Sequence, residues 1–234
     1  MASPFLNSPK HWLHTTLRPD PELGVITNVE SGGTPSTVNS KFWDGDIPWL
    51  TPKEITPYSD RVYVSKTERT ITIKGLSNSG AKLMPAGTVM LTKRAPVGYV
   101  VINAIPMTTN QGFMNFQCGP KIRPLYLAYW LRANRPYLEI VSNGSTYPEL
   151  YKGDLFEFKI AVPPIDEQDA ILNVISAIQY VSLLGLPLEQ SVTTPELMIE
   201  MQGLNRRLRT IRDAILPKLL SGELDVSKVS TNFL

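Results

Sequence analysis

The sequence predicts an α+β protein: a mixed globular domain with short strands and few helices, followed by a long coiled-coil-type helical region. Two observations predict this fold class. Short β-branched and aromatic runs, broken by Gly, Pro, Asn and Ser, fill residues 1 to about 160, a texture typical of strands and turns. From residue 166 onward, apolar residues recur at helical spacing instead. We therefore expect one domain over residues 1–164 and a helical region over residues 165–234.

Within the first domain, one helix and several strands are expected. The helix should run from about Pro124 to Ile140, where leucines recur near helical spacing beside Tyr126 and Trp130. A last strand is expected from Phe156 to Val162. Four earlier runs are short, β-branched and punctuated by glycines, as strands are: residues 62–64, 70–73, 89–92 and 99–102.

The helical region is expected to contain two helices. Asp166 follows a proline pair and suits an N-cap, and the first helix should break at Gly185 and Pro187. The second starts with Pro195 in its first turn, and Pro217 should kink or end it. An ordinary amphipathic helix packed on the first domain is one interpretation of its apolar stripe. The other is a homodimer interface, because the apolar positions are spaced four and three apart as in a coiled-coil seam: Leu197, Met201, Leu204, Leu208, Ile211 and Ile215.

Charge is distributed unevenly along the chain. The net charge is +2, but residues 1–165 hold 17 Lys and Arg against 12 Asp and Glu, while residues 166–234 hold 6 against 9. The basic excess is concentrated in residues 51–100, with eight cations and three carboxylates. Such a surface suits a polyanion, because each phosphate contact releases counterions. A solvated basic face without a ligand is the other interpretation.

Residues 31–55 are the most distinctive stretch. Gly32, Gly33 and several prolines favour fixed turns, and Trp43 and Trp49 lie among them. We expect a loop held in one shape, which on a rigid scaffold is where recognition usually takes place.

The sequence contains no recognisable set of catalytic residues. His11, His14 and the single Cys118 make no recognisable zinc cluster, and neither a phosphate-binding loop nor a nucleophile elbow occurs. Glu157 and Lys159 have the spacing of many metal-dependent nucleases, but no second carboxylate is suitably placed to hold a metal. We therefore expect a chain that is not an enzyme and binds neither metal nor cofactor.

The chain lacks an apolar run of the length of a membrane span, and its N-terminus lacks the apolar core of a secretory signal. A single cysteine excludes an internal disulfide and fits a reducing compartment. We expect a cytoplasmic protein with no membrane partner.

Residues 31–55 also resemble the start of a target-recognition domain in the specificity subunits of type I restriction-modification systems. Further segments resemble the same family and follow its order. They correspond to its proline-glycine turn with a strand and basic loop, its Asn-Gln-Gly segment, the end of the domain with its join to the helices, and the closing helix: residues 83–99, 108–113, 143–146 with 162–168, and 215–224.

A typical specificity subunit has two recognition domains and two conserved helical regions, whereas this chain has one of each. The chain is therefore either a natural half-subunit, which the family features at both ends favour, or a shortened piece of a longer one. For the half-subunit, the resemblance implies pairing with a second copy through antiparallel helices. The two recognition domains of such a pair would recognise inverted half-sites in double-stranded DNA. It also implies methyltransferase subunits that modify adenine with S-adenosylmethionine, bound by the partner and not by this chain, and a motor-nuclease subunit.

The expected DNA contacts follow from side-chain chemistry. Lys93 and Arg94 follow a strand on a turn, where long cations reach phosphate. Asn110 and Gln111 are amides of the kind that pair with adenine, or they hold the loop. The candidate DNA-binding residues are Lys53, Arg61, Lys66, Arg69, Lys74, Lys93, Arg94, Asn110, Gln111, Ser145 and Thr146.

Two other functions compete with DNA reading. One is a small metal-dependent nuclease that would use Glu157 and Lys159. The other is a protein-interaction module whose basic surface binds an acidic partner.

Overall fold

The computed structural model describes residues 8–56, 62–142, 149–184 and 210–224. The chain forms two compact units: Thr15–Ile160 make up the body of the first, and the second joins the segment ending at His14 to the chain from Ala161 onward. The domain boundary between residues 164 and 165 stays a prediction, because compactness alone does not establish a domain that folds independently.

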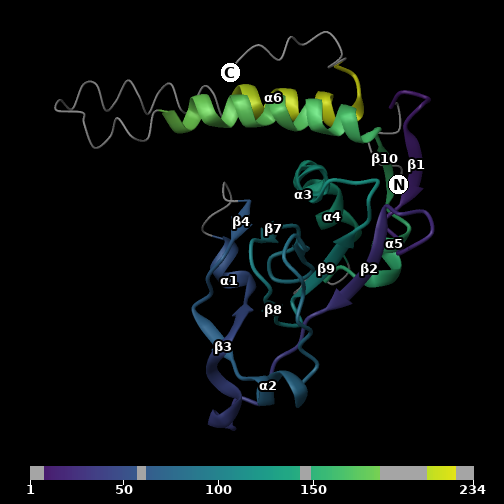
Figure 1. The fold of residues 1–234 in the computed structure, drawn as a ribbon. Coiled ribbons are helices and arrows are strands. Elements are labelled where there is room, and N and C mark those ends of the chain that lie inside the picture. Colours follow the sequence, from purple (N-terminus) through teal and green to yellow (C-terminus); the bar gives the residue numbers. More distant parts are fainter. Residues whose placement is uncertain (1–7, 57–61, 143–148, 185–209, 225–234) are drawn as a thin grey trace, which may run out of the picture. The chain divides into compact units, whose positions relative to one another are not determined.

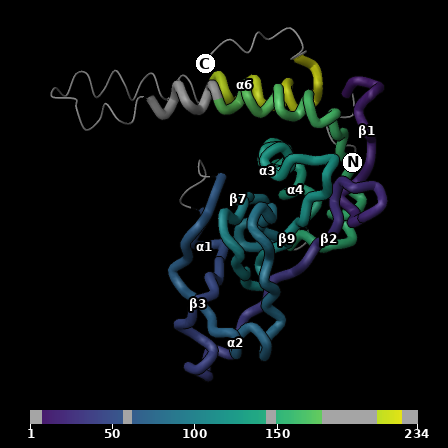
Figure 2. The backbone as a smooth tube through the Cα atoms, viewed as in Figure 1, coloured from purple at the N-terminus to yellow at the C-terminus, as the bar shows by residue number. Residues whose placement is uncertain are grey.

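The first unit is built on a five-stranded sheet (Figure 1). All its neighbours pair antiparallel except the edge strand β4, which runs parallel to β7. Figure 2 shows β2 and β9 as adjacent segments of the backbone, although they lie far apart in sequence. The strands, in sheet order, are β2 (Ile26–Ser31), β9 (Phe113–Cys118), β6 (Val89–Thr92), β7 (Val100–Asn103) and β4 (Tyr63–Val64).

The central strand of a second, three-stranded sheet lies within the stretch that was expected to be a loop. Its central strand β3 (Trp43–Leu50) pairs antiparallel with β5 (Arg69–Ile71) and parallel with β8 (Thr108–Thr109). The loop expectation was wrong for these eight residues. Gly45 and Pro48 are poor strand residues. Gly45 lies where the register of β3 shifts, between Trp43 and Ile47, and such a bulge accommodates it, whereas Pro48 lies beyond the bulge and pairs with Thr70.

The glycines at the start of that stretch are needed for close packing. A Cβ on Gly32 would overlap the backbone of Asn110, and a Cβ on Gly33 would overlap the backbone of Gly80. Residues of the second sheet contribute to two apolar clusters. One contains Leu50, Ile55, Met84, Met90, Val101, Met107 and Phe113, and the other contains Phe42, Trp43, Trp49, Ile71 and Ala81.

The expected helix from Pro124 to Ile140 is divided in two. Helix α3 (Pro124–Ala133) packs against β6 and β7, and α4 (Arg135–Val141) follows it directly. Asn134 between them leaves helical geometry, with φ −90° and ψ 4°, and its side-chain Nδ2 donates to the Trp130 carbonyl 2.9 Å away. Local amide bonding of this kind competes with the helical ladder, so the apolar spacing continues across a break in the backbone.

Other short elements differ from expectation for similar local reasons. The strand expected over residues 70–73 ends at Ile71, because the Thr72 hydroxyl accepts from the Gly75 amide and caps α2 (Ile73–Ser77). The last expected strand is shorter and begins after α5 (Lys152–Phe156). The remaining named elements are η1 (Ser40–Phe42), α1 (Pro52–Ile55) and a two-stranded sheet of β1 (Leu13–Thr16) and β10 (Lys159–Val162).

The second unit contains helix α6 (Ile165–Leu184) and a helix over residues 210–221. Helix α6 begins one residue before Asp166, so this side chain lies in the first turn and not at the N-cap. The later helix continues past Pro217, so of the two expected effects of this proline the helix end was wrong. Burial of Leu219 and Leu220 offsets the roughly 3 kcal/mol that an interior proline costs. None of the described helices is both long and apolar enough to cross a membrane.

The segment before β1 is fastened to the helices of its own unit. Trp12 Nε1 donates to Glu167 Oε2 at 2.9 Å, and His11 Nε2 lies 2.7 Å from Glu167 Oε1. Gly222 has φ +73°, and a Cβ there would collide with Pro9. The N-terminal segment therefore binds both the first turn of α6 and the end of the later helix.

Candidate nucleic-acid interface

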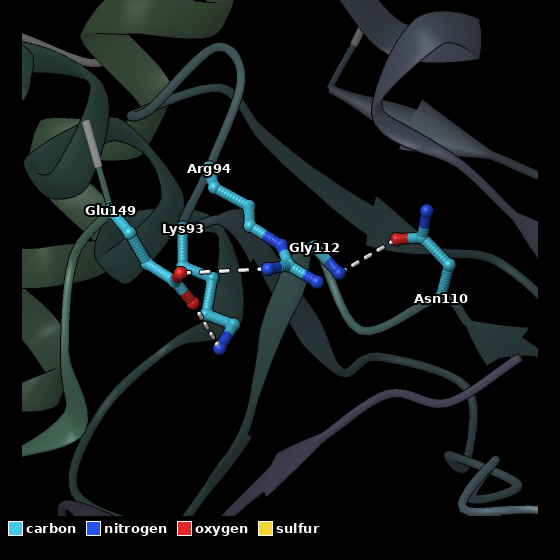
Figure 3. Close-up of polar contacts among 5 residues, drawn as sticks. All are labelled: Lys93, Arg94, Asn110, Gly112 and Glu149. Atoms are coloured by element: carbon cyan, nitrogen blue, oxygen red, sulfur yellow. Dashed lines mark hydrogen bonds and ion pairs between the residues drawn. The ribbon is translucent and has the colours of Figure 1, made fainter. Parts of the chain in front are cut away.

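Lys93 and Arg94 share one carboxylate of their own chain. Lys93 Nζ lies 2.8 Å from Glu149 Oε1, and Arg94 Nη1 lies 3.5 Å from Oε2 (Figure 3). The Leu150 amide donates to the Lys93 carbonyl at 2.8 Å, which holds the two segments in register. The Lys93 side chain is 18% exposed and that of Arg94 is 41% exposed. Arg94 is thus the more accessible of the two.

The electrostatics of this cluster follow from the pairing. The hydrogen bond from Lys93 lowers the pKa of the Glu149 carboxyl, and the charges of Lys93 and Arg94 act in the same direction against partial burial. Glu149 is therefore ionised at neutral pH and compensates one of the two positive charges. The cluster of Lys93, Arg94 and Glu149 therefore has a net charge of +1, where the sequence predicted +2.

Asn110 and Gln111 form hydrogen bonds within the chain. Asn110 Oδ1 accepts from the Gly112 amide at 2.9 Å, an arrangement that closes a tight turn between β8 and β9 (Figure 3). The Gln111 side-chain oxygen accepts from the Thr34 hydroxyl. Of the two roles considered for these amides, the geometry favours holding the loop.

The remaining described cations of the candidate set are differently placed. Lys53 on α1, Lys66 before β5, Arg69 on β5 and Lys74 on α2 are exposed, and none pairs with a carboxylate of the described residues. Two further lysines between residues 41 and 82 share these properties and were missed as candidates: Lys41 and Lys82. Lys82 belongs to the basic excess of residues 51–100. The signal that selects it is that its side chain is exposed and has no carboxylate partner among the described residues, and the sequence does not show this.

We call these six side chains the cationic lobe. It is formed by Lys41, Lys53, Lys66, Arg69, Lys74 and Lys82. Four carboxylates of the described residues lie in the same sequence interval. Glu54 accepts from the Thr51 amide and hydroxyl and from the Glu68 amide, so its oxygens serve the local backbone. Asp44, Asp46 and Glu68 are exposed. The six cations outnumber these four carboxylates and form no ion pairs with them, so the lobe keeps a net positive charge.

Several predicted positions fall outside the described residues. These are Arg61, Ser145 and Thr146 among the DNA candidates, and Leu197, Met201, Leu204 and Leu208 of the seam. Of the two remaining seam positions, Ile211 is 48% exposed and Ile215 is half-buried.

The two nuclease candidates lie in different local settings. Glu157 follows α5 and pairs with Arg18, whereas Lys159 is exposed on β10. Within the described ranges, no group of three or more His, Cys, Asp and Glu side chains is arranged to hold a metal ion. Burial raises the pKa of the Cys118 thiol to about 12, so at neutral pH this thiol is protonated and a poor nucleophile.

Comparison with known proteins gives consistent matches. A family model described as the type I restriction modification DNA specificity domain matches residues 21–184. The MjaIX specificity subunit of Methanocaldococcus jannaschii is 42% identical over 153 residues, 64% of this chain and 35% of that protein. The EcoR124I/EcoR124II specificity subunit of Escherichia coli is 29% identical over 160 residues, 65% of this chain and 39% of that protein.

Solved structures share the fold. The HsdS subunit of Thermoanaerobacter tengcongensis superposes with a TM-score of 0.55 at 19% identity, covering 94% of this chain and 47% of that one. A chain from a structure of type I R-M complex assembly gives 0.58 at 20% identity, with coverages of 96% and 49%. This chain therefore spans less than half the length of these relatives. Since the family model covers more than half of the chain, the chain belongs to the type I restriction-modification DNA specificity family.

Proposed function

We propose that this chain is the DNA sequence-specificity subunit of a type I restriction-modification system. It recognises a half-site in duplex DNA and directs methyltransferase subunits, which supply S-adenosylmethionine, to adenines in that sequence. A motor-nuclease subunit joins the same assembly, and the chain itself contributes no catalytic group. Family membership and the names of the curated relatives, which are specificity subunits, support this proposal.

The observation that carries the proposal is the cationic lobe. Its six exposed cations have no carboxylate partner among the described residues, so they can neutralise phosphates without breaking internal pairs. Phosphate contacts fix a protein's register on duplex DNA, and base contacts then read the sequence.

DNA binding is tested with the purified chain and its methyltransferase partner on duplexes from the source genome. We expect tight binding to the subset that carries the target, with affinity falling steeply as salt rises. Failure to bind any duplex with the partner present would contradict the proposal and favour a protein-interaction module. Magnesium-dependent cleavage by the chain alone would contradict it and favour a nuclease.

We also propose that two copies pair through the seam, with the same surface used on both. The spacing of its six apolar residues and the exposure of Ile211 support this. Two recognition domains related by a twofold axis then bind inverted half-sites at a fixed separation.

Dimerisation is tested by sedimentation of a Leu204→Glu, Leu208→Glu variant, which should be monomeric. The control is Ile73→Glu, an exposed apolar residue of α2 outside the seam, which should leave the dimer intact. A dimeric double variant would show that the interface lies elsewhere.

A further inference from the structure

Arg69 differs from the other cations of the lobe because an aromatic pair holds it. Its guanidinium carbon lies 3.5 Å from the centroid of the Trp43 ring and 5.7 Å from that of Trp49. The two rings meet edge to face, with centroids 5.0 Å apart and planes at 87°. At 3.5 Å the guanidinium is within the range of a cation–π interaction.

The aromatic pair is rigid. Trp43 Nε1 donates to the Ser36 carbonyl at 3.1 Å, and Trp49 Nε1 donates to the Gly33 carbonyl at 2.8 Å. Both residues are nearly fully buried. With their polar atoms satisfied and their rings packed in the second apolar cluster, the indoles have one orientation.

The backbone of Arg69 is also fixed. Arg69 stands opposite Trp49 in the β3–β5 ladder, and its carbonyl accepts from the Thr67 hydroxyl at 2.7 Å. The same hydroxyl oxygen accepts from the Trp49 amide at 3.2 Å. The side chain therefore starts from a defined point and lies along a defined surface.

The charge of Arg69 is not matched by an internal carboxylate. Other described arginines form ion pairs: Arg18 with Glu157, Arg94 with Glu149, and Arg135 with Glu139. Arg69 is exposed and has no such partner among the described residues. The Trp43 ring lies against the guanidinium, whose N–H donors lie in its own plane and suit bidentate contact with phosphate.

We propose that Arg69 donates to a phosphate of the bound DNA duplex and that Trp43 and Trp49 are positioning residues for this contact. This inference rests on the proposed function. A cation held in place before binding loses less conformational freedom on contact than a free lysine does. Arg69 should therefore contribute more to affinity than a freely rotating cation of the lobe.

The test measures the affinity of the full chain for a labelled duplex of mixed sequence across a range of salt concentrations. Arg69→Gln removes the charge and should weaken binding about tenfold and reduce the salt slope by about 1. The control Lys159→Gln removes one exposed positive charge of β10, outside the lobe, and should change affinity less than about twofold.

Arg69→Lys separates charge from position. Lysine keeps the charge but not the planar stack, so the salt slope should stay near that of the unsubstituted chain while affinity falls. Thermal unfolding of each variant identifies the temperature at which all are folded for the binding measurement.

Unchanged affinity and slope in Arg69→Gln would overturn the inference while leaving the proposed function standing. Weaker binding with an unchanged slope would also overturn it, because it would assign Arg69 a role other than phosphate contact. If the unsubstituted chain with its methyltransferase partner bound no duplex, the proposed function itself would fail.

Discussion

Lys93 Nζ lies 2.8 Å from Glu149 Oε1, so a lysine chosen from the sequence as a DNA contact forms an ion pair within its own chain. The pair joins segments 56 residues apart and lies beside the Leu150–Lys93 backbone hydrogen bond. Its position gives Lys93 a structural role that the residues of the cationic lobe lack.

Lys93→Ala should lower the free energy of unfolding by about 1–3 kcal/mol, because it leaves a partly buried carboxylate without its main partner. Lys66→Ala, at an exposed and unpaired cation, should change stability by less than about 0.5 kcal/mol. Denaturant unfolding of both variants measures the difference. Equal losses in the two variants would show that the Glu149 pair does not stabilise the fold.

The pH dependence of stability should report Glu149. Its folded pKa is lowered from the ordinary 4.5, so its contribution to stability is fully present above the unfolded pKa. That contribution is lost as the pH falls through the lower, folded value. We expect Glu149→Gln to lose stability relative to the unsubstituted chain at pH 7 and to approach it at acid pH. A constant difference across that range would contradict this assignment.

Gly33→Ala should be severely destabilising, by about 3 kcal/mol or more, because the added Cβ overlaps the Gly80 backbone, which cannot move as a side chain would. Gly153→Ala is the matched control: a Cβ there meets nothing within 4 Å. Thermal unfolding compares them, and similar melting temperatures would mean that the Gly33–Gly80 contact relaxes easily.

Trp12→Phe should cost about 1 kcal/mol or more, because it removes the donor to Glu167 and replaces the buried indole with a smaller aromatic ring. Protease susceptibility of the N-terminal segment should rise in step, since His11 alone then holds the carboxylate. Unchanged cleavage would indicate that packing of Pro9 and Trp12 around Gly222, and not the hydrogen bond, fastens this segment.

The elements that the sequence predicts well are those in which local pattern and burial agree. The run 89–92 is β6, buried at all four positions, and the run 99–102 differs from β7 by one residue. Strand β3 was missed because Gly45 and Pro48 oppose strand formation locally, and its pairing with β5 and β8, which are distant in sequence, compensates. Strands β2 and β9 were missed because polar residues interrupt them; Asn115 is buried with its Nδ2 donating to Thr109 Oγ1, a contact invisible in sequence.

For the candidate interface, too, the sequence predicts what depends on local composition and misses what depends on distant contacts. A count of charges located the basic excess, but which cations are free depends on partners far away in sequence. Glu149 neutralises part of the Lys93 and Arg94 charge, and Trp43 holds Arg69 across 26 residues. The tryptophans of residues 31–55, first a sign of a shaped loop, lie in a strand that supports a cation.

Methylation mapping of the source genome, with and without this gene, tests the central claim most directly. The account predicts that adenine methylation at one bipartite sequence with inverted half-sites disappears when the gene is deleted and returns when it is restored. An unchanged methylation pattern in the deletion strain, with the methyltransferase genes intact and expressed, would contradict it.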